Sequence, residues 1–474
     1  MASVKRELFN GVIFTAIGKY SYVIINILIT AVLARILTPS DFGVVAIATV
    51  IINFFSMLSD MGIGPAIIQN KDLGKRDLSS IFNLTLYMGV LLTAIFFLSA
   101  NLFADYYENE KLVSVVQLFS ISIFFHCADI VPHNLIVKAK RFSFLAYSNV
   151  IIQIISGVAS IVAALLGWGI YALLVQPVLS SMLLLAVDLS QNWMLPSIIV
   201  RKSAVSKIFS YSLYQFLFSF INYFSRNLDK LVVGRIFGVN DLSYYEKSYR
   251  LMMLPVGNLS HIITPAIQPI FSAFQNDKHL LYQRSLRLFR LFALMGFPIS
   301  VFLFFCSKEV ILIAFGDQWY GAISVFQILS LSVGFQMIYS PQGTFFQSAN
   351  AVREMFCCGV VTAILNVVSV LVGCLLFKDI HILSWMIVAS YILAFILTYY
   401  VMIKRVFEGS FKSFLCVLIQ PIGLSALIAI PLLLLSMVLP EMNVFISFTL
   451  KCVTTIIVVG LFELKTKYIR KLIK

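Results

Sequence analysis

Three ionisable side chains, Arg226, Asp229 and Lys230, lie inside an apolar stretch of the chain. A charge at the centre of a bilayer costs roughly 2.5–3.5 kcal/mol on insertion scales, so a charge at such a position usually serves a function. Arg226 and Lys230 are four residues apart and would share one face of a helix. A guanidinium can hold two phosphate oxygens at once, and an ammonium adds a point charge. The pattern therefore indicates a surface that binds phosphate or an acidic sugar.

A second mixed cluster follows in the next apolar stretch, where Glu246, Lys247 and Arg250 are spaced to share a helix face. Lys19, in the first apolar stretch, could add another positive charge. If Asp229 and Glu246 only neutralised their neighbours as inter-helix ion pairs, two positive charges of the two clusters would stay uncompensated, which burial penalises. We therefore expect a cationic, water-filled cleft between two lobes, and the ion-pair interpretation is the alternative.

Acidic and imidazole groups inside other apolar stretches could bind a coupling ion, either Na⁺ or H⁺. His126 and Asp129 are three residues apart and could relay protons, and Asp188 closes the sixth apolar stretch. The alternative is that these are satisfied packing residues. The candidate coupling groups are Asp60, His126, Asp129, Asp229 and Glu246.

The elements that position these groups must be membrane helices. Of the 474 residues, 60% are hydrophobic and 12% are charged, whereas a soluble domain carries about 25% charged residues. The net charge of +14 is spread in small clusters between apolar runs, which does not favour a nucleic-acid partner. The seven cysteines show no metal-binding or disulfide spacing. No Gly-rich phosphate loop, GxSxG or HExxH is present, so we expect neither an enzyme nor a cofactor.

Apolar runs of about 20 residues, the length that spans a bilayer, predict an all-α, polytopic membrane protein with about fourteen helices. Twelve is the lower count, because the seventh and eighth runs carry charges. The predicted spans are 12–34, 42–64, 80–104, 112–132, 144–166, 169–190, 207–233, 242–266, 287–306, 322–348, 355–377, 383–403, 414–438 and 443–463.

Basic residues alternate with these spans. Twenty-four of the 35 lie in loops on the side of the N-terminus, and only six, Lys451 among them, fall in the opposite loops. By the positive-inside rule, both termini are predicted to be cytoplasmic. The predicted organisation is an N-lobe of six helices (1–190), a cytoplasmic linker (191–206), a C-lobe of six helices (207–403), and two further helices with a basic tail (404–474).

An internal repeat supports two pseudo-symmetric lobes around a central cavity. Arg35 and Asp41 recur as Arg235 and Asp241, and the segment 65–67 recurs as 265–267, all at an offset of 200. Because six predicted spans separate the copies, both enter the membrane in the same direction, which is a known transporter architecture.

Two segments resemble a known family. Leu33-Ala34-Arg35-Ile36-Leu37-Thr38-Pro39-Ser40-Asp41-Phe42-Gly43 and Ser225-Arg226-Asn227-Leu228-Asp229-Lys230 are similar to segments of polysaccharide exporters in the multidrug/oligosaccharidyl-lipid/polysaccharide superfamily, above all the Wzx-type O-antigen, capsule and teichuronic acid flippases. The resemblance covers nearly the whole chain. In such flippases the cavity is cationic, and the positions that match are Lys19, Arg226, Lys230, Lys247 and Arg250.

The resemblance implies a multi-pass protein of the bacterial inner membrane that moves undecaprenyl-pyrophosphate-linked oligosaccharides to the outer leaflet, with an ion as antiport partner. The implied partners are this substrate, membrane lipid and the polymerase machinery for surface polysaccharide. Two alternatives remain. A small-cation drug exporter of the same superfamily should have an acidic cavity, and a membrane polymerase or ligase should have a large outer loop.

Overall fold

The computed structural model describes residues 2–70, 72–194, 196, 199–272, 277–438 and 442–466. Within these ranges the ordered elements are helices, and the predicted all-α membrane architecture is confirmed. By contact density the chain divides into two compact units, with the boundary between Ser243 and Tyr244. Unit 1 precedes this boundary and unit 2 follows it. The predicted lobe limits, based on the repeat, stay a prediction.

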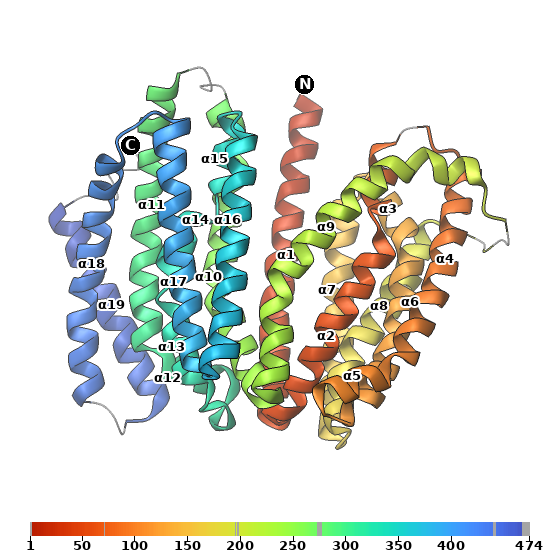
Figure 1. The fold of residues 1–474 in the computed structure, drawn as a ribbon, viewed down its shortest axis with the longest axis horizontal. Coiled ribbons are helices and arrows are strands. Elements are labelled where there is room, and N and C mark those ends of the chain that lie inside the picture. The colour runs from red at the N-terminus through yellow and green to blue at the C-terminus, as the bar shows by residue number, and fades with distance from the viewer. Residues whose placement is uncertain are drawn as a thin grey trace. The chain divides into compact units, whose positions relative to one another are not determined.

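Unit 1 contains nine helices in its described residues. The long helices α1, α2, α4, α6, α7 and α8 pack side by side, and α9 curves across α2 (Figure 1). α9 packs against α2, α3, α4 and α5. The bounds are α1 (Ala2–Ile36), α2 (Pro39–Asp60), α3 (Ile63–Gln69), α4 (Lys75–Leu98), α5 (Ala100–Tyr107), α6 (Lys111–Lys138), α7 (Phe142–Leu165), α8 (Ala172–Gln191) and α9 (Lys202–Ile236), with a 3₁₀ turn at Gly169–Tyr171.

Unit 2 begins inside α10 (Gly238–Ser272). Its interior is aromatic. The ring of Phe289 lies 4.9 Å from that of Phe345 and 5.0 Å from that of Tyr399, and Tyr399 stacks on Phe414 at 5.2 Å. The other bounds are α11 (Lys278–Phe305), α12 (Ser307–Phe315), α13 (Ala322–Ser330), α14 (Val333–Tyr339), α15 (Gln342–Ser348), α16 (Val352–Leu371), α17 (Ile380–Val401), α18 (Phe411–Val438) and α19 (Val444–Thr466), with a 3₁₀ turn at Asp317–Trp319 and π-helical segments at Val372–Phe377 and Met402–Val406.

Eleven described helical segments are long and apolar enough to cross a bilayer, and the chain is therefore a multi-pass membrane protein. A twelfth span results if Ala322–Ser330 and Val333–Ser348, which meet at 49°, are counted together. The predicted spans 207–233 and 242–266 coincide with α9 and α10, each a helix of 35 residues that is outside this apolar set. The count of fourteen stays a prediction.

The start of α2 follows directly from its sequence. The backbone N–H of Asp41 donates to Thr38 Oγ1 at 3.3 Å, and Asp41 Oδ2 accepts from the N–H of Thr38 at 3.2 Å, which makes a capping box with Pro39 in the first turn. The helix ends where Met61 (φ 38°) and Gly62 (φ 72°) enter the left-handed region, so α3 is a separate short helix. The second predicted span is thus broken near its C-terminal end.

The predicted repeat is visible in the element bounds. α1 ends at Ile36 and α9 ends at Ile236, so the two helices end 200 positions apart. The helices that follow them differ, because α2 is broken at residues 61–62 while α10 is continuous to Ser272. These matching helices support a duplication whose copies have diverged.

Small residues bring the helices of unit 1 into close contact, as is common in membranes, where lipid provides no hydrophobic drive for helix association. A Cβ on Gly157 of α7 would lie 1.9 Å from Ile29 Cδ1 of α1. A Cβ on Gly43 of α2 would lie 1.8 Å from the carbonyl oxygen of Val239, at the start of α10. The second contact is with backbone, which cannot rotate away.

We therefore expect Gly43→Ala to lower the stability of the protein by about 1–3 kcal/mol, the usual range for overpacking. Thermal unfolding of the purified protein in detergent micelles measures this. Gly423→Ala is the matched control, because a Cβ on Gly423 meets nothing within 4 Å. Equal unfolding temperatures for the two variants would contradict the close α2–Val239 contact.

Candidate functional site

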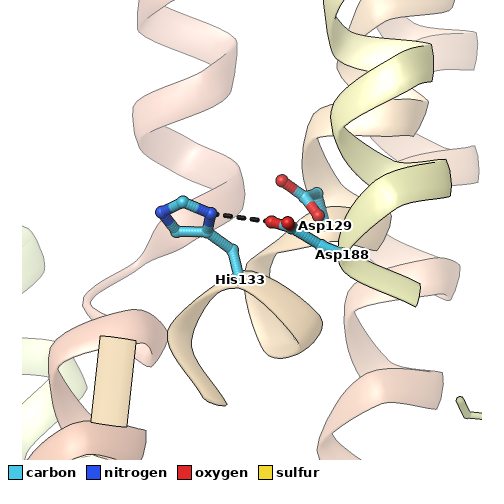
Figure 2. A group of neighbouring side chains, drawn as sticks. All are labelled: Asp129, His133 and Asp188. Atoms are coloured by element: carbon cyan, nitrogen blue, oxygen red, sulfur yellow. Dashed lines mark hydrogen bonds and ion pairs between the residues drawn. The ribbon is translucent and has the colours of Figure 1, made fainter. Parts of the chain in front are cut away.

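Two helices of unit 1 bring an imidazole and two carboxyl groups together. Asp129 and His133 are one turn apart on α6, and Asp188 lies one turn before the end of α8, which packs against α6. His133 Nδ1 is 2.8 Å from Asp188 Oδ2. Figure 2 shows the imidazole pointing at Asp188 with Asp129 beside it, and one donor atom from each residue lies within 4.8 Å of the others. We name these three residues the acidic cluster.

Burial makes this cluster unusual. Asp188 is 0% exposed, and the side chain of His133 is 35% exposed. The Oδ1 atoms of Asp129 and Asp188 are both buried and accept no hydrogen bond from any described residue. A buried carboxylate oxygen without a donor is costly. The cluster therefore favours a positively charged occupant.

A cavity of about 320 Å³ borders the acidic cluster. It is lined by Ser56, Met57 and Asp60 from α2, and by His126, Asp129, Ile130, His133 and Asn134 from α6. Asp60 Oδ1 accepts from the backbone N–H of Gly64 at 3.3 Å, across the break between α2 and α3. Asp60, His126 and Asp129, three predicted coupling groups, therefore share one cavity.

Sequence reasoning did not identify His133 as a partner of Asp129. The predicted relay partner, His126, lines the same cavity, but the imidazole that joins the buried carboxyl groups belongs to His133. The sequence pattern could have identified His133, because residues 129 and 133 are four apart and face the same side of a helix. The predicted relay between His126 and Asp129 stays a prediction.

The predicted substrate-binding residues of unit 1 lie on α1 and α9. Lys19 is exposed on α1, and Asp229 and Lys230 are half-buried near the end of α9. The side chain of Arg226 lies outside the described residues. α9 thus carries charge along a helix of 35 residues, about 50 Å at a rise of 1.5 Å per residue.

In unit 2 the predicted residues lie on α10. Lys247 is 6% exposed and its Nζ lies 3.4 Å from Glu246 Oε2, whereas Arg250 is exposed. The opposite side of the helix is held by Ser248, which donates to the carbonyl of Ala322 at 3.0 Å, and by Tyr249, whose hydroxyl is 2.9 Å from that of Tyr391. Lys247 is therefore part of the packed helix, whereas Arg250 lies on the exposed side of α10. The predicted cleft between the lobes stays a prediction.

One basic residue that was predicted to lie on the outer side is buried instead. Lys451 Nζ lies 2.6 Å from Glu309 Oε1 and donates to the carbonyl of Phe305 at 2.8 Å. Ser447 donates to the same carboxylate oxygen at 2.6 Å. Both charged side chains are 5% exposed, so this ion pair fixes α19 to α12.

Comparison with known proteins identifies the family and the fold of the chain. The profile of a family described as polysaccharide biosynthesis protein matches residues 32–324. The chain is 26% identical over 351 residues to the teichuronic acid biosynthesis protein TuaB of Bacillus subtilis (strain 168), a match that covers 73% of this chain and 72% of that protein. It is 24% identical over 430 residues to the lipopolysaccharide biosynthesis protein WzxC of Escherichia coli (strain K12), covering 89% and 86%. The structure of the lipid II flippase MurJ, in an inward closed conformation, has the same fold, with a TM-score of 0.73 at 15% identity over 98% of this chain and 100% of that one.

Proposed function

The chain belongs to the family of polysaccharide biosynthesis proteins, and from this we propose that it is a flippase, which carries lipid-linked oligosaccharide units across the bacterial inner membrane. The substrate moves from the cytoplasmic to the outer leaflet by alternating access, and no covalent bond changes. Both termini lie in the cytoplasm, as the distribution of basic residues predicts. The polymerase machinery for surface polysaccharide takes up the product outside.

The observation that carries this proposal is the polarity of α9 and α10. Each is a helix of 35 residues, which exceeds the roughly 20 residues that cross a bilayer, and neither is among the described apolar spans. A helix of that length with charges at Asp229, Lys230, Lys247 and Arg250 would be costly against lipid. We infer that water or a charged ligand contacts one face of each helix in addition to the neighbouring side chains.

The sign of the charge favours an anionic ligand. In the two predicted clusters together with Lys19, five basic residues, Lys19, Arg226, Lys230, Lys247 and Arg250, exceed the two acidic residues Asp229 and Glu246. A pyrophosphate has the charge and the oxygen geometry that lysine and arginine bind best. The basic side chains thus hold the pyrophosphate while the lipid tail stays in the bilayer. A cation, Na⁺ or H⁺, moves inward and offsets the cost of moving the anion.

A second candidate is an exporter of small cationic molecules. The cavity beside the acidic cluster, with Asp60 and Asp129 in its lining, favours a cation and is large enough for a small one. On the proposed function this cavity belongs to the coupling ion. On the second candidate it would bind the exported molecule itself.

Complementation separates the two functions. The wild-type protein is expressed in bacterial strains that lack their own flippase and make different glycans, and surface polysaccharide and ethidium accumulation are both measured. We expect at least one glycan to return to the surface while ethidium accumulation is unchanged. Restored export of ethidium with no glycan at the surface would favour the second candidate. The empty vector is the control, and membrane amounts are matched.

A further inference from the structure

Asp129 lies on α6 and Asp188 lies on α8, and their carboxyl groups approach each other directly within the acidic cluster. Asp188 is 0% exposed, and each carboxyl keeps one buried oxygen without a hydrogen-bond donor among the described residues. Two carboxylates that share a site with little water cannot both stay ionised cheaply. The pair therefore requires a positive charge in addition to what its surroundings supply.

Among the described residues of α6, the neighbouring cationic groups supply one such charge at most. His133 Nδ1 lies 2.8 Å from Asp188 Oδ2, and a protonated His133 would balance Asp188 only. Lys138, the next cation along α6, is held elsewhere, because its Nζ donates to the carbonyls of Ile67 at 2.7 Å and Asn70 at 2.6 Å. Asp129 is left without a cation from these groups.

We propose that Asp129 and Asp188 hold one exchangeable proton between them, and that this proton is the coupling ion of the transporter. The first half stands on the geometry alone, and the second half rests on the proposed function. On loading, a hydronium ion in the cavity gives up a proton, and an O–H bond forms on one carboxyl while the other accepts a hydrogen bond. On release, that O–H bond breaks and the proton returns to water. His133 acts as a positioning residue, since its hydrogen bond fixes the orientation of Asp188.

The cavity of about 320 Å³ is the route by which water reaches the pair, because Asp129 and His133 both line it. The titratable groups that border the pair are His133 and His126 on α6 and Asp60 on α2. The other elements packed against α6 and α8, including α3, α4 and α7, contribute no residue to the described lining. Proton exchange at the pair should therefore respond to these three groups.

A proton fits the site better than a sodium ion. When Asp188 is ionised, the contact of 2.8 Å requires the hydrogen on Nδ1 of His133, and this nitrogen then has no lone pair for a metal ion. Hard metal ions need several oxygen ligands in a defined shell, and besides the acids the cavity lining offers only Ser56 and Asn134 as side-chain oxygen donors. A proton needs one oxygen from each carboxyl.

Infrared difference spectroscopy tests proton binding without any substrate. The purified full-length protein in phosphatidylcholine vesicles is titrated with pH in H₂O and D₂O, and the carbonyl band of a protonated carboxyl is followed. We expect a band that Asp129→Asn and Asp188→Asn both lose and that Asp105→Asn, which changes an exposed acid on α5, keeps. His133→Gln should keep the band and shift its midpoint pH. A band that persists in both cluster variants, or that NaCl but not choline chloride removes at constant pH, overturns the proposal.

Export in the complementation strain tests the coupling. We expect Asp129→Asn to lose export at normal membrane amounts while Asp105→Asn keeps it. Normal export by Asp129→Asn would overturn the coupling role and leave the flippase function standing. If the infrared band behaves as expected and the wild type restores no glycan, the shared proton stands and the proposed function fails with its coupling role.

Discussion

Lys451→Met should lower the stability of the protein by about 3–5 kcal/mol, because removing one partner of a buried ion pair leaves an uncompensated charge. Glu309 would stay buried, with its Oε1 bonded only to Ser447 among the described residues and its Oε2 without a donor. The junction between α12 and α19 should loosen first. Thermal unfolding of the purified protein in detergent micelles, followed by tryptophan fluorescence, measures the loss.

The double variant Lys451→Met with Glu309→Gln should recover most of this stability, since no charge is then buried. Lys412→Met is the matched control, because Lys412 is exposed at the start of α18. A single variant as stable as this control would show that the Lys451–Glu309 pair contributes nothing. Failure of the double variant to recover would assign the loss to the carbonyl contact with Phe305 instead.

Arg250→Gln should reduce the export of surface glycan by about 10- to 100-fold, since a hydrogen bond to a charged group contributes about 1.5–3 kcal/mol. Arg250 is exposed on α10, so its removal leaves the helix packed through Ser248 and Tyr249. Arg250→Lys should keep part of the activity, because the charge remains while the two-pronged grip on phosphate is lost. The rate at which labelled glycan appears on complemented cells measures all three.

Arg405→Gln is the control for this series, because Arg405 is exposed at the end of the helix that begins as α17. Normal export by Arg250→Gln at matched membrane amounts would remove Arg250 from the binding site. Lys247 is less informative, since it is buried against Glu246 and its loss would also disturb folding.

The helices could be predicted from the sequence because lipid imposes a simple rule, that about 20 apolar residues cross the bilayer. The start of α2 follows equally from the sequence, since Thr38 and Asp41 form a capping box and Pro39 occupies the first turn, without contacts from other helices. The position of the break after Asp60 could not be predicted from the sequence. Gly62 marks a weak point, but the left-handed conformation of Met61 depends on how α3 packs against α6.

The family could also be predicted, and the match over residues 32–324 confirms it. The acidic cluster could be predicted only in part. Helical periodicity shows which residues share a face, and it singled out Asp129, but it does not say which helix meets that face. The approach of Asp188 joins residues 55 positions apart at His133, and the burial of Lys451 joins residues 142 apart. Contacts at such separations arise from packing between helices, and the spacing of residues within one helix does not predict which helices pack together.

An interrupted α2 and an uninterrupted α10 make the two members of the predicted repeat unequal. The interrupted member has Asp60, at the edge of the break, in the lining of the acidic cavity, whereas the continuous member has Arg250 exposed on α10. If both proposals hold, the coupling proton binds in unit 1, whereas Arg250 on α10 binds the substrate, so the two members of the predicted repeat have different tasks. Drift in α10 can then change the glycan repertoire of a lineage while the ion chemistry of unit 1 is inherited unchanged.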